Sequence, residues 1–219
     1  ILGTTGVGKS TFVNAIAGYE ASQTSDELGL CTRKVVPIAC QPCEGRGVVM
    51  VDTPGFDNTD LSDMDAFRLV AAWLKQTYED GIKLSGVLLL HRITDNRLNG
   101  GAHRLLNVFK DICGPDALKN SLLVTTMWDQ IEEAQGSERE QELAEAFWSP
   151  MIARGARVKR FLNTPESALD IVSLLANDAL QYPLLLQVEL VDEGKDLART
   201  TAGRSILSWL NDRLDVIRK

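Results

Sequence analysis

One stretch near the start of the chain reads Gly3-Thr4-Thr5-Gly6-Val7-Gly8-Lys9-Ser10, and it fits the pattern G-x-x-x-x-G-K-S. Its glycines let backbone N–H groups turn inward around a phosphate, and the following helix presents the positive end of its dipole. Lys9 would supply charge to the β- and γ-phosphates, and the Ser10 hydroxyl is placed to ligate Mg²⁺. Apolar strand residues precede the pattern and a helical stretch from Thr11 follows it, which disfavours a chance glycine-rich turn. We therefore predict a phosphate-binding loop over residues 3–11.

A second motif, Asp-Thr-Pro-Gly, occupies residues 52–55 and follows the hydrophobic run 48–51. A hydrophobic strand that ends in an aspartate fits the Walker-B arrangement, in which Asp52 holds Mg²⁺ through a water. Gly55 leaves room for its own N–H to approach the γ-phosphate, so its peptide can sense whether that phosphate is present. Taken alone the motif is a plausible turn. Downstream of a phosphate-binding loop it predicts a nucleotide-sensing switch.

The loop-like stretch 19–33 lies between these two motifs and is rich in hydroxyl and acidic side chains. A first switch needs a threonine that closes on Mg²⁺ and the γ-phosphate. Thr32, just before the second predicted strand, is our choice, and Thr24 and Ser25 are the alternatives. For any one of them, an ordinary solvated loop is the competing interpretation.

The residues that would choose the base follow the run 122–124 and read Thr125-Thr126-Met127-Trp128-Asp129. This is the T-x-x-D form of a guanine-reading motif, and it makes Thr126 and Asp129 candidate base-loop residues. The Asp129 carboxylate can accept from both N1–H and the exocyclic amine of guanine, donors that adenine does not present together. Met127 stands where a lysine stem commonly covers the base, and a thioether can do that packing. The alternative is that Asp129 caps the next helix, which would leave an ATP-using enzyme open.

A further base contact is predicted after the last strand, where the chain reads Phe-Leu-Asn-Thr over residues 161–164. A second base-contacting loop belongs at this place, and Asn163 is its candidate. The competing interpretation is a plain turn residue.

Short apolar runs alternate with helical spacing along the chain. Five runs have the length of buried strands: residues 35–39, 48–51, 87–90, 122–125 and 158–161. Such alternation predicts a mostly parallel sheet with helices on both faces, with one antiparallel pair where only the turn 41–45 joins two strands. We predict an α/β fold: a three-layer P-loop (Ras-like) G domain over residues 1–177 and a C-terminal helical extension over residues 178–219. In its last helix Leu207, Leu210, Leu214 and Ile217 form an apolar seam, which favours packing on the domain over a partner helix.

Length and charge narrow the function classes. The 219 residues suffice for one well-buried α/β domain, and the net charge of −7 makes a broad grip on nucleic acid or anionic lipid unexpected. No apolar run approaches the roughly 20 residues of a spanning helix. The four cysteines form no dense disulfide framework, so we expect a reducing, cytoplasmic location. Only Ile1 and Leu2 precede the loop, so we expect a fragment cut inside its first strand.

These motifs together resemble the septin, Toc and GIMAP branch of the TRAFAC GTPases, and more specifically the GIMAP-type G domain. The resemblance covers about residues 1–177 and rests on the phosphate loop, on D-T-P-G-F-D, on T-x-x-D, and on the segment Leu-Leu-Leu-His-Arg-Ile-Thr-Asp-Asn-Arg over residues 88–97. In that family the last segment is a characteristic box that contributes to contacts between G domains. The resemblance implies GTP or GDP with Mg²⁺ as ligand and a nucleotide-dependent homodimer through the G-domain face.

The position after Gly55 is unusual, because Ras-like enzymes place there a glutamine that orients the attacking water. Here it is Phe56, and a phenyl ring cannot orient water. We therefore expect slow hydrolysis that rises on association, with Arg97 or Arg92 acting across a dimer as an arginine finger. The competing interpretation of this segment is a polar loop paired with Asp95. The second hypothesis for the whole chain is a nucleotide-stabilised interaction module with little turnover.

Overall fold

The computed structural model describes residues 1–21, 34–43, 45–57, 61–96, 100–176 and 182–217. Its main sheet has four parallel strands in the order β1-β4-β5-β6. These strands are β1 (Leu2–Gly3), β4 (Val87–Arg92), β5 (Ser121–Thr126) and β6 (Arg157–Arg160). The parallel order requires a crossover between successive strands, and helices supply each of them. The predicted α/β class with a mostly parallel sheet is confirmed.

A two-stranded hairpin accompanies this sheet. It consists of β2 (Val36–Cys43) and β3 (Arg46–Asp52), which pair antiparallel as predicted. The end of β3 runs beside β1, since the Ile1 backbone nitrogen donates to the Val51 carbonyl at 3.0 Å and the Thr53 hydroxyl donates to the Ile1 carbonyl at 2.6 Å. The hairpin therefore brings the Asp-Thr-Pro-Gly motif alongside the phosphate loop.

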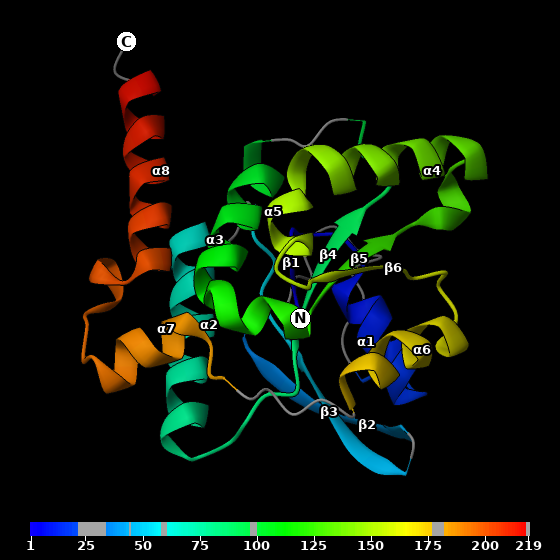
Figure 1. The fold of residues 1–219 in the computed structure, drawn as a ribbon, viewed down its shortest axis with the longest axis horizontal. Helices are drawn as coiled ribbons and strands as arrows, with labels where there is room; N and C mark the ends of the chain where they lie inside the picture. The colour runs from blue at the N-terminus through cyan, green and yellow to red at the C-terminus, as the bar shows by residue number, and fades with distance from the viewer. Residues whose placement is uncertain (22–33, 44, 58–60, 97–99, 177–181, 218–219) are drawn as a thin grey trace.

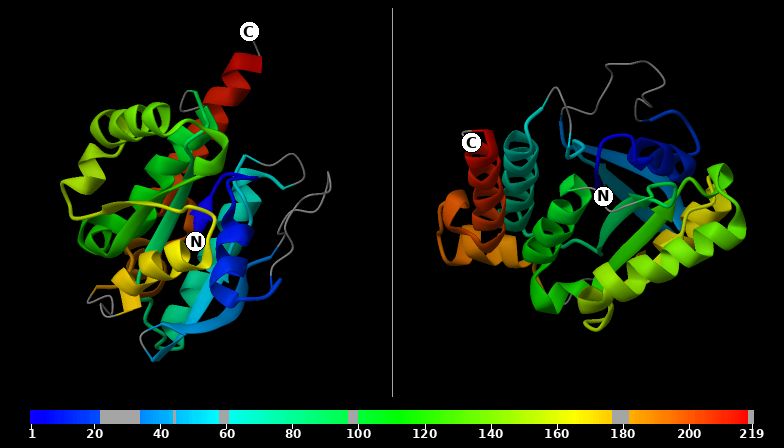
Figure 2. Two further views of the ribbon diagram at one scale, coloured as in Figure 1. Left: turned by 90° about the vertical axis from the view of Figure 1, so that its right-hand side faces the viewer. Right: turned by 90° about the horizontal axis from the view of Figure 1, so that it is seen from above.

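Helices cover both faces of the main sheet (Figures 1 and 2). Alternate strand residues point to opposite faces, so Val87 and Leu89 join one apolar core while Leu88 and Leu90 join another. The helices of the first core include α2, α3 and α5, and those of the second are α1 and α6. Their bounds are α1 (Lys9–Ala17), α2 (Asp63–Glu79), α3 (Gly100–Ala117), α4 (Glu133–Glu142), α5 (Ser149–Ile152), α6 (Pro165–Ala176), α7 (Leu185–Gln187) and α8 (Thr201–Ile217). The predicted three layers are thus present.

The C-terminal elements pack back onto α2 and α3, as predicted. Of the predicted apolar seam, Leu207 is half-buried, and the side chains of the other three residues lie outside the described part of the chain. α7 and the π-helical turn Val188–Asp192 contact α2, and α8 lies along α3 before its end extends past the body (Figure 1). Ala202 and Ile206 are buried in this contact. The buried Glu189 carboxylate accepts from the Thr201 backbone N–H at 2.9 Å and from Lys195 at 2.9 Å, which fixes the start of α8. The boundary predicted at residue 177 lies outside the described residues.

The acidic stretch after β5 forms α4, whose side chains are mostly exposed, as a solvated helix face requires. The Glu140 side chain is largely buried, and it accepts from Arg160 on β6. Within the described part of the chain, none of the helices combines the length and the apolar character of a membrane-spanning segment.

Candidate functional site

The phosphate loop has the backbone geometry that its glycines allow. Gly6 and Gly8 adopt positive φ angles of 74° and 91°, a region that glycine enters at no steric cost. Gly8 then stands directly before α1, whose first residue is Lys9. The Lys9 ammonium is buried and donates to the carbonyls of Gly3 at 3.2 Å and Thr4 at 3.0 Å. The loop therefore holds a positive charge at the start of a helix, where anions bind favourably.

Two of the three predicted metal residues, Ser10 and Asp52, lie together. Ser10, in the first turn of α1, donates its hydroxyl to Asp52 Oδ2 at 3.0 Å, although 42 positions separate them in sequence. Asp52 is fully buried at the end of β3. A hydroxyl beside a carboxylate is the oxygen donor set that Mg²⁺ prefers, so these residues fit the ion.

The Asp-Thr-Pro-Gly-Phe segment is joined to the phosphate loop through the backbone. The Thr5 N–H donates to the Phe56 carbonyl at 2.8 Å, and the Phe56 N–H donates to the Gly3 carbonyl at 3.2 Å. Gly55 is required here, because a Cβ at this position would lie 2.8 Å from Thr5 Cα. The predicted switch therefore starts in contact with the loop whose phosphate it would sense.

On the base side, Asp129 is exposed and lies inside the short 3₁₀ helix Trp128–Gln130. The helix-capping alternative is wrong, since α4 begins at Glu133 with Glu132 at its N-cap position. The Thr126 hydroxyl is buried and donates to the Val7 carbonyl at 2.9 Å, with the His91 carbonyl also within 3.3 Å. This hydroxyl joins the base loop to the phosphate loop, and a Thr126 contact with nucleotide stays a prediction.

Asn163 is exposed after β6 and has a left-handed backbone with φ of 59°, a conformation in which asparagine is common in turns. Its position agrees with both interpretations given above, so its contact with the base stays a prediction.

The predicted dimer box, residues 88–97, starts within β4 and continues into the loop that follows it. Arg92 forms an ion pair with Asp95 at 3.2 Å, as the polar-loop interpretation requires. From α4, Arg139 donates to the carbonyls of Ile93 at 3.0 Å and Thr94 at 2.9 Å. These contacts hold the first part of the loop against the domain. Arg97 and Thr32 lie outside the described residues.

His91 stands between the sheet and α5. It is buried, and its ring meets the Trp148 ring edge-on with centroids 6.2 Å apart. Burial lowers the pKa of His91 from its usual 6.5, because an apolar surrounding disfavours the charged imidazolium.

Sequence reasoning missed a group of side chains behind the base loop: Trp128, Glu140 and Arg160. No motif marks them, since they come from a loop, a helix and a strand that are far apart in sequence. One signal was available, because the strand that contains Arg160 was predicted to lie in the same parallel sheet as the strand that precedes the base loop.

The fold and this geometry define a P-loop nucleotide-binding domain of Ras-like architecture. The family described as 50S ribosome-binding GTPase (MMR_HSR1) matches residues 1–126, and the chain belongs to this family. It is a GTP-binding GTPase domain.

Two curated relatives are similar to this chain in sequence. GTP-binding protein A of Dictyostelium discoideum is 29% identical over 131 residues, which cover 60% of this chain and 28% of that protein. GTPase Der of Enterococcus faecalis is 25% identical over 224 aligned positions, which cover 90% of this chain and 46% of that protein. The chain therefore spans less than half the length of either relative.

Solved structures share the fold. Toc33 from Arabidopsis thaliana in complex with GDP and Mg²⁺ has a TM-score of 0.62 at 19% identity, over 84% of each chain. Era, solved with MgGDPNP and a segment of 16S ribosomal RNA, has a TM-score of 0.59 at 20% identity, over 84% of this chain and 57% of that one. Both neighbours were solved with nucleotide and Mg²⁺.

Proposed function

We propose that this domain is a slow GTPase switch whose GTP-bound form pairs with a second copy, and that pairing accelerates hydrolysis. The observation that carries the proposal is Phe56. It occupies the position of the water-orienting glutamine, yet its ring is 4% exposed and packs in the apolar core beside α2 and α3. A buried phenyl ring offers the attacking water no hydrogen bond. A single copy therefore lacks the usual catalytic group at this position.

The loop after β4 is our source for the missing group. A guanidinium that reaches the partner's phosphates would stabilise negative charge on the transferring phosphoryl group, with an effect of about 10³-fold or more. Arg97 is the favoured candidate, because Arg92 is already paired with Asp95. One solved Toc33 structure is described as a dimerisation-deficient arginine-to-alanine variant. A second solved structure is described with the statement that dimerisation is important for the GTPase activity of the chloroplast translocon components Toc33 and Toc159. Both support the proposal by likeness of fold.

We assign the nucleotide contacts residue by residue. The loop 3–11 would bind the phosphates, with Lys9 on the β- and γ-oxygens. Ser10 would hold Mg²⁺ directly and Asp52 through a water, and Thr32 would close on the ion in the GTP-bound form. The ion supplies positive charge that neutralises the phosphate oxygens.

Asp129 would read guanine, with Thr126 and Asn163 as neighbouring contacts. Recognition of guanine by Asp129 distinguishes the proposed GTPase from an ATP-using enzyme, since adenine does not present the two hydrogen-bond donors from which the carboxylate would accept.

We propose that the chain belongs to the septin, Toc and GIMAP branch, as a GIMAP-type G domain. Its motifs resemble that family, and the likeness to the Toc33 fold supports the proposal. A second copy, rather than nucleic acid, is the proposed partner, because the net charge of −7 disfavours a phosphate backbone.

Single-turnover GTP hydrolysis measured against protein concentration tests the proposal. The rate per protomer should rise with concentration. Arg97→Ala should abolish the rise and leave GTP affinity nearly unchanged, while Arg92→Ala should do so only if Arg92 leaves Asp95 in the dimer. Arg68→Ala, on the exposed surface of α2, is the control and should behave like the unmodified protein.

Rates that do not depend on concentration, together with a monomeric complex with a non-hydrolysable GTP analogue, would contradict the proposal. The better interpretation would then be the nucleotide-stabilised interaction module. Its working surface would be the C-terminal helices, of which α8 extends past the body (Figure 1).

A further inference from the structure

A group of side chains lies directly behind the proposed guanine-reading loop. The Arg160 guanidinium on β6 stacks over the Trp128 ring, with Cζ 4.0 Å from the ring centroid. Trp128 is 8% exposed and immediately precedes Asp129 in the chain. The ring also lies against α4, because a Cβ on Gly136 would come within 2.6 Å of it. The residue next to Asp129 is therefore fixed by an arginine and by a helix.

The same tryptophan is held at its edge. Its Nε1–H donates to the Thr125 hydroxyl oxygen at 3.0 Å. That hydroxyl lies 3.1 Å from Glu140 Oε1 and 3.2 Å from the Lys159 carbonyl. A hydroxyl has one proton to donate and can accept at the same time. Both ends of the turn from Thr125 to Trp128 are thus tied to α4 and β6.

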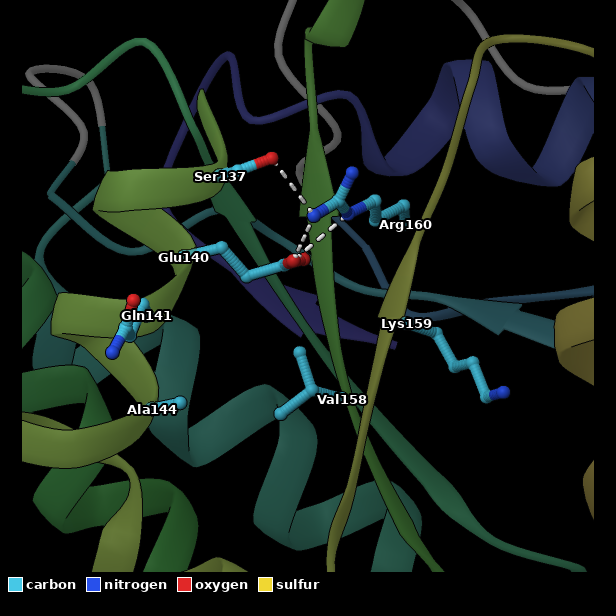
Figure 3. Close-up of a pocket in the computed structure, with 7 residues that line it drawn as sticks. All are labelled: Ser137, Glu140, Gln141, Ala144, Val158, Lys159 and Arg160. Atoms are coloured by element: carbon cyan, nitrogen blue, oxygen red, sulfur yellow. Dashed lines mark hydrogen bonds and ion pairs between the residues drawn. The ribbon is translucent and has the colours of Figure 1, made fainter. Parts of the chain in front are cut away.

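Glu140 closes the network. Its second oxygen accepts from Arg160 Nε at 2.8 Å, and Arg160 also donates to Glu133 at 2.6 Å and lies within 3.3 Å of the Ser137 hydroxyl. Figure 3 shows the Arg160 guanidinium turned toward Glu140 and Ser137, whereas the neighbouring Lys159 points away from them. Charge-assisted bonds of this kind have narrow geometric limits and fix the planar group that makes them.

The place of Arg160 in the sheet explains why it can control this loop. It is paired in register with Thr125, and the next residue, Phe161, donates its N–H to the Thr125 carbonyl at 2.8 Å. The predicted base-loop residues Asp129 and Asn163 both follow from this pair of strand ends. A shift of the Arg160 side chain would therefore act first on the strand ends from which these residues follow.

We propose that Arg160, through Trp128 and Glu140, positions Asp129 and thereby sets the preference of this domain for guanine over adenine nucleotides. Arg160 is a positioning residue, since its guanidinium is occupied by Glu133 and Glu140. The inference rests on the proposed reading of guanine by Asp129.

The test compares GDP and ADP affinities, measured by calorimetry with Mg²⁺. Arg160→Met keeps much of the stem that covers the ring and removes the charged bonds. The GDP-over-ADP ratio should fall about tenfold, as expected when charge-assisted bonds to the base weaken, while ADP affinity should stay unchanged. Trp128→Phe, which keeps a ring and loses the bond to Thr125, should give a smaller fall and does not disturb the ion pairs.

Arg157→Met is the matched control. Arg157 lies on the same strand and donates to the Leu174 carbonyl at 3.1 Å, away from the base loop. It should lower thermal stability without changing the ratio. An unchanged ratio in both Arg160→Met and Trp128→Phe, with GDP preferred by the unmodified protein, would overturn the inference alone. Equal GDP and ADP affinities in the unmodified protein would overturn the proposed guanine reading, and the inference with it.

Discussion

The proposed phosphate side of this site and its proposed base side are built by different means. The phosphate side comprises residues 3–11 and 52–56. Backbone N–H to carbonyl hydrogen bonds join its two segments, and glycines with a left-handed backbone shape the first of them. The base side comprises residues 125–129 and 161–163, and it is fixed by side chains from α4 and β6, chiefly Glu140 and Arg160. One hydroxyl joins the two, since Thr126 donates to the Val7 carbonyl.

This difference bears on what a short motif can encode. Backbone geometry depends on the local residues, and glycine or proline at a given position indicates a particular backbone conformation. The orientation of a carboxylate depends on whatever packs behind it. We therefore expect substitutions on the phosphate side to affect every nucleotide, and those on the base side to affect only the choice of base.

Lys9→Ala should have the largest effect. Removal of the ammonium should weaken both GTP and GDP by about a hundredfold or more, because charge-assisted bonds to phosphate are lost. The ratio of GDP to ADP affinity should not change, since the base side is intact. Calorimetry on the variant, with the exposed Lys83→Ala as control, measures both quantities. A changed base preference in Lys9→Ala would break the separation between the two sides.

Asp129→Asn should have the next largest effect and the opposite pattern. The preference for GTP over ATP should fall by roughly thirtyfold, because the carboxylate can no longer accept two charge-assisted bonds. Affinity for xanthine nucleotides should rise, since their altered edge suits an amide. Competition binding with GTP, ATP and a xanthine nucleotide measures this, with Asp80→Asn on the surface as control. Equal loss of GTP and ATP would mean that Asp129 supports the loop without reading the base.

The same contrast explains which features could be predicted. The parallel sheet and its helices followed from apolar spacing. The structure also brings two predicted motifs together as the Ser10–Asp52 pair, while their contact with nucleotide stays a prediction. The alternative that Asp129 caps the next α-helix was wrong, because α4 begins four residues later, at Glu133. The sequence did not reveal the contacts among Trp128, Glu140 and Arg160. These contacts depend on how β5 and β6 pair and on where α4 packs, and no local sequence pattern encodes either.

Gly55→Ala tests the backbone of the phosphate side, with a moderate expected effect. The added Cβ would lie 2.8 Å from Thr5 Cα and 2.9 Å from Thr5 N, so the two segments must separate. Overpacking of this kind costs about 1–3 kcal/mol, and the melting temperature should fall by several degrees. Gly47→Ala on β3 is the control, since nothing lies within 4 Å of its Cβ position. Equal melting temperatures for the two variants would show that the close contact is not needed.

The smallest effect at neutral pH concerns His91, whose carbonyl lies 3.3 Å from the Thr126 hydroxyl that joins the two sides. Burial lowers the pKa of His91 below 6.5, so the unfolded chain binds a proton more readily than the folded one. Folding stability should therefore be fully present above pH 6.5 and decline as the pH falls toward the lowered pKa.

Urea unfolding between pH 5.5 and 7.5 measures this decline, and the chain offers a matched pair because it has two histidines. His91→Gln should flatten the pH dependence over this range, whereas the exposed His103→Gln should keep it. Because the Thr126 hydroxyl connects the proposed phosphate side with the proposed base side, GDP and ADP affinities should change with pH by the same factor. If stability still declines with falling pH in His91→Gln, other groups cause the decline. A base preference that changes with pH would mean that the Thr126 contact affects the base side alone.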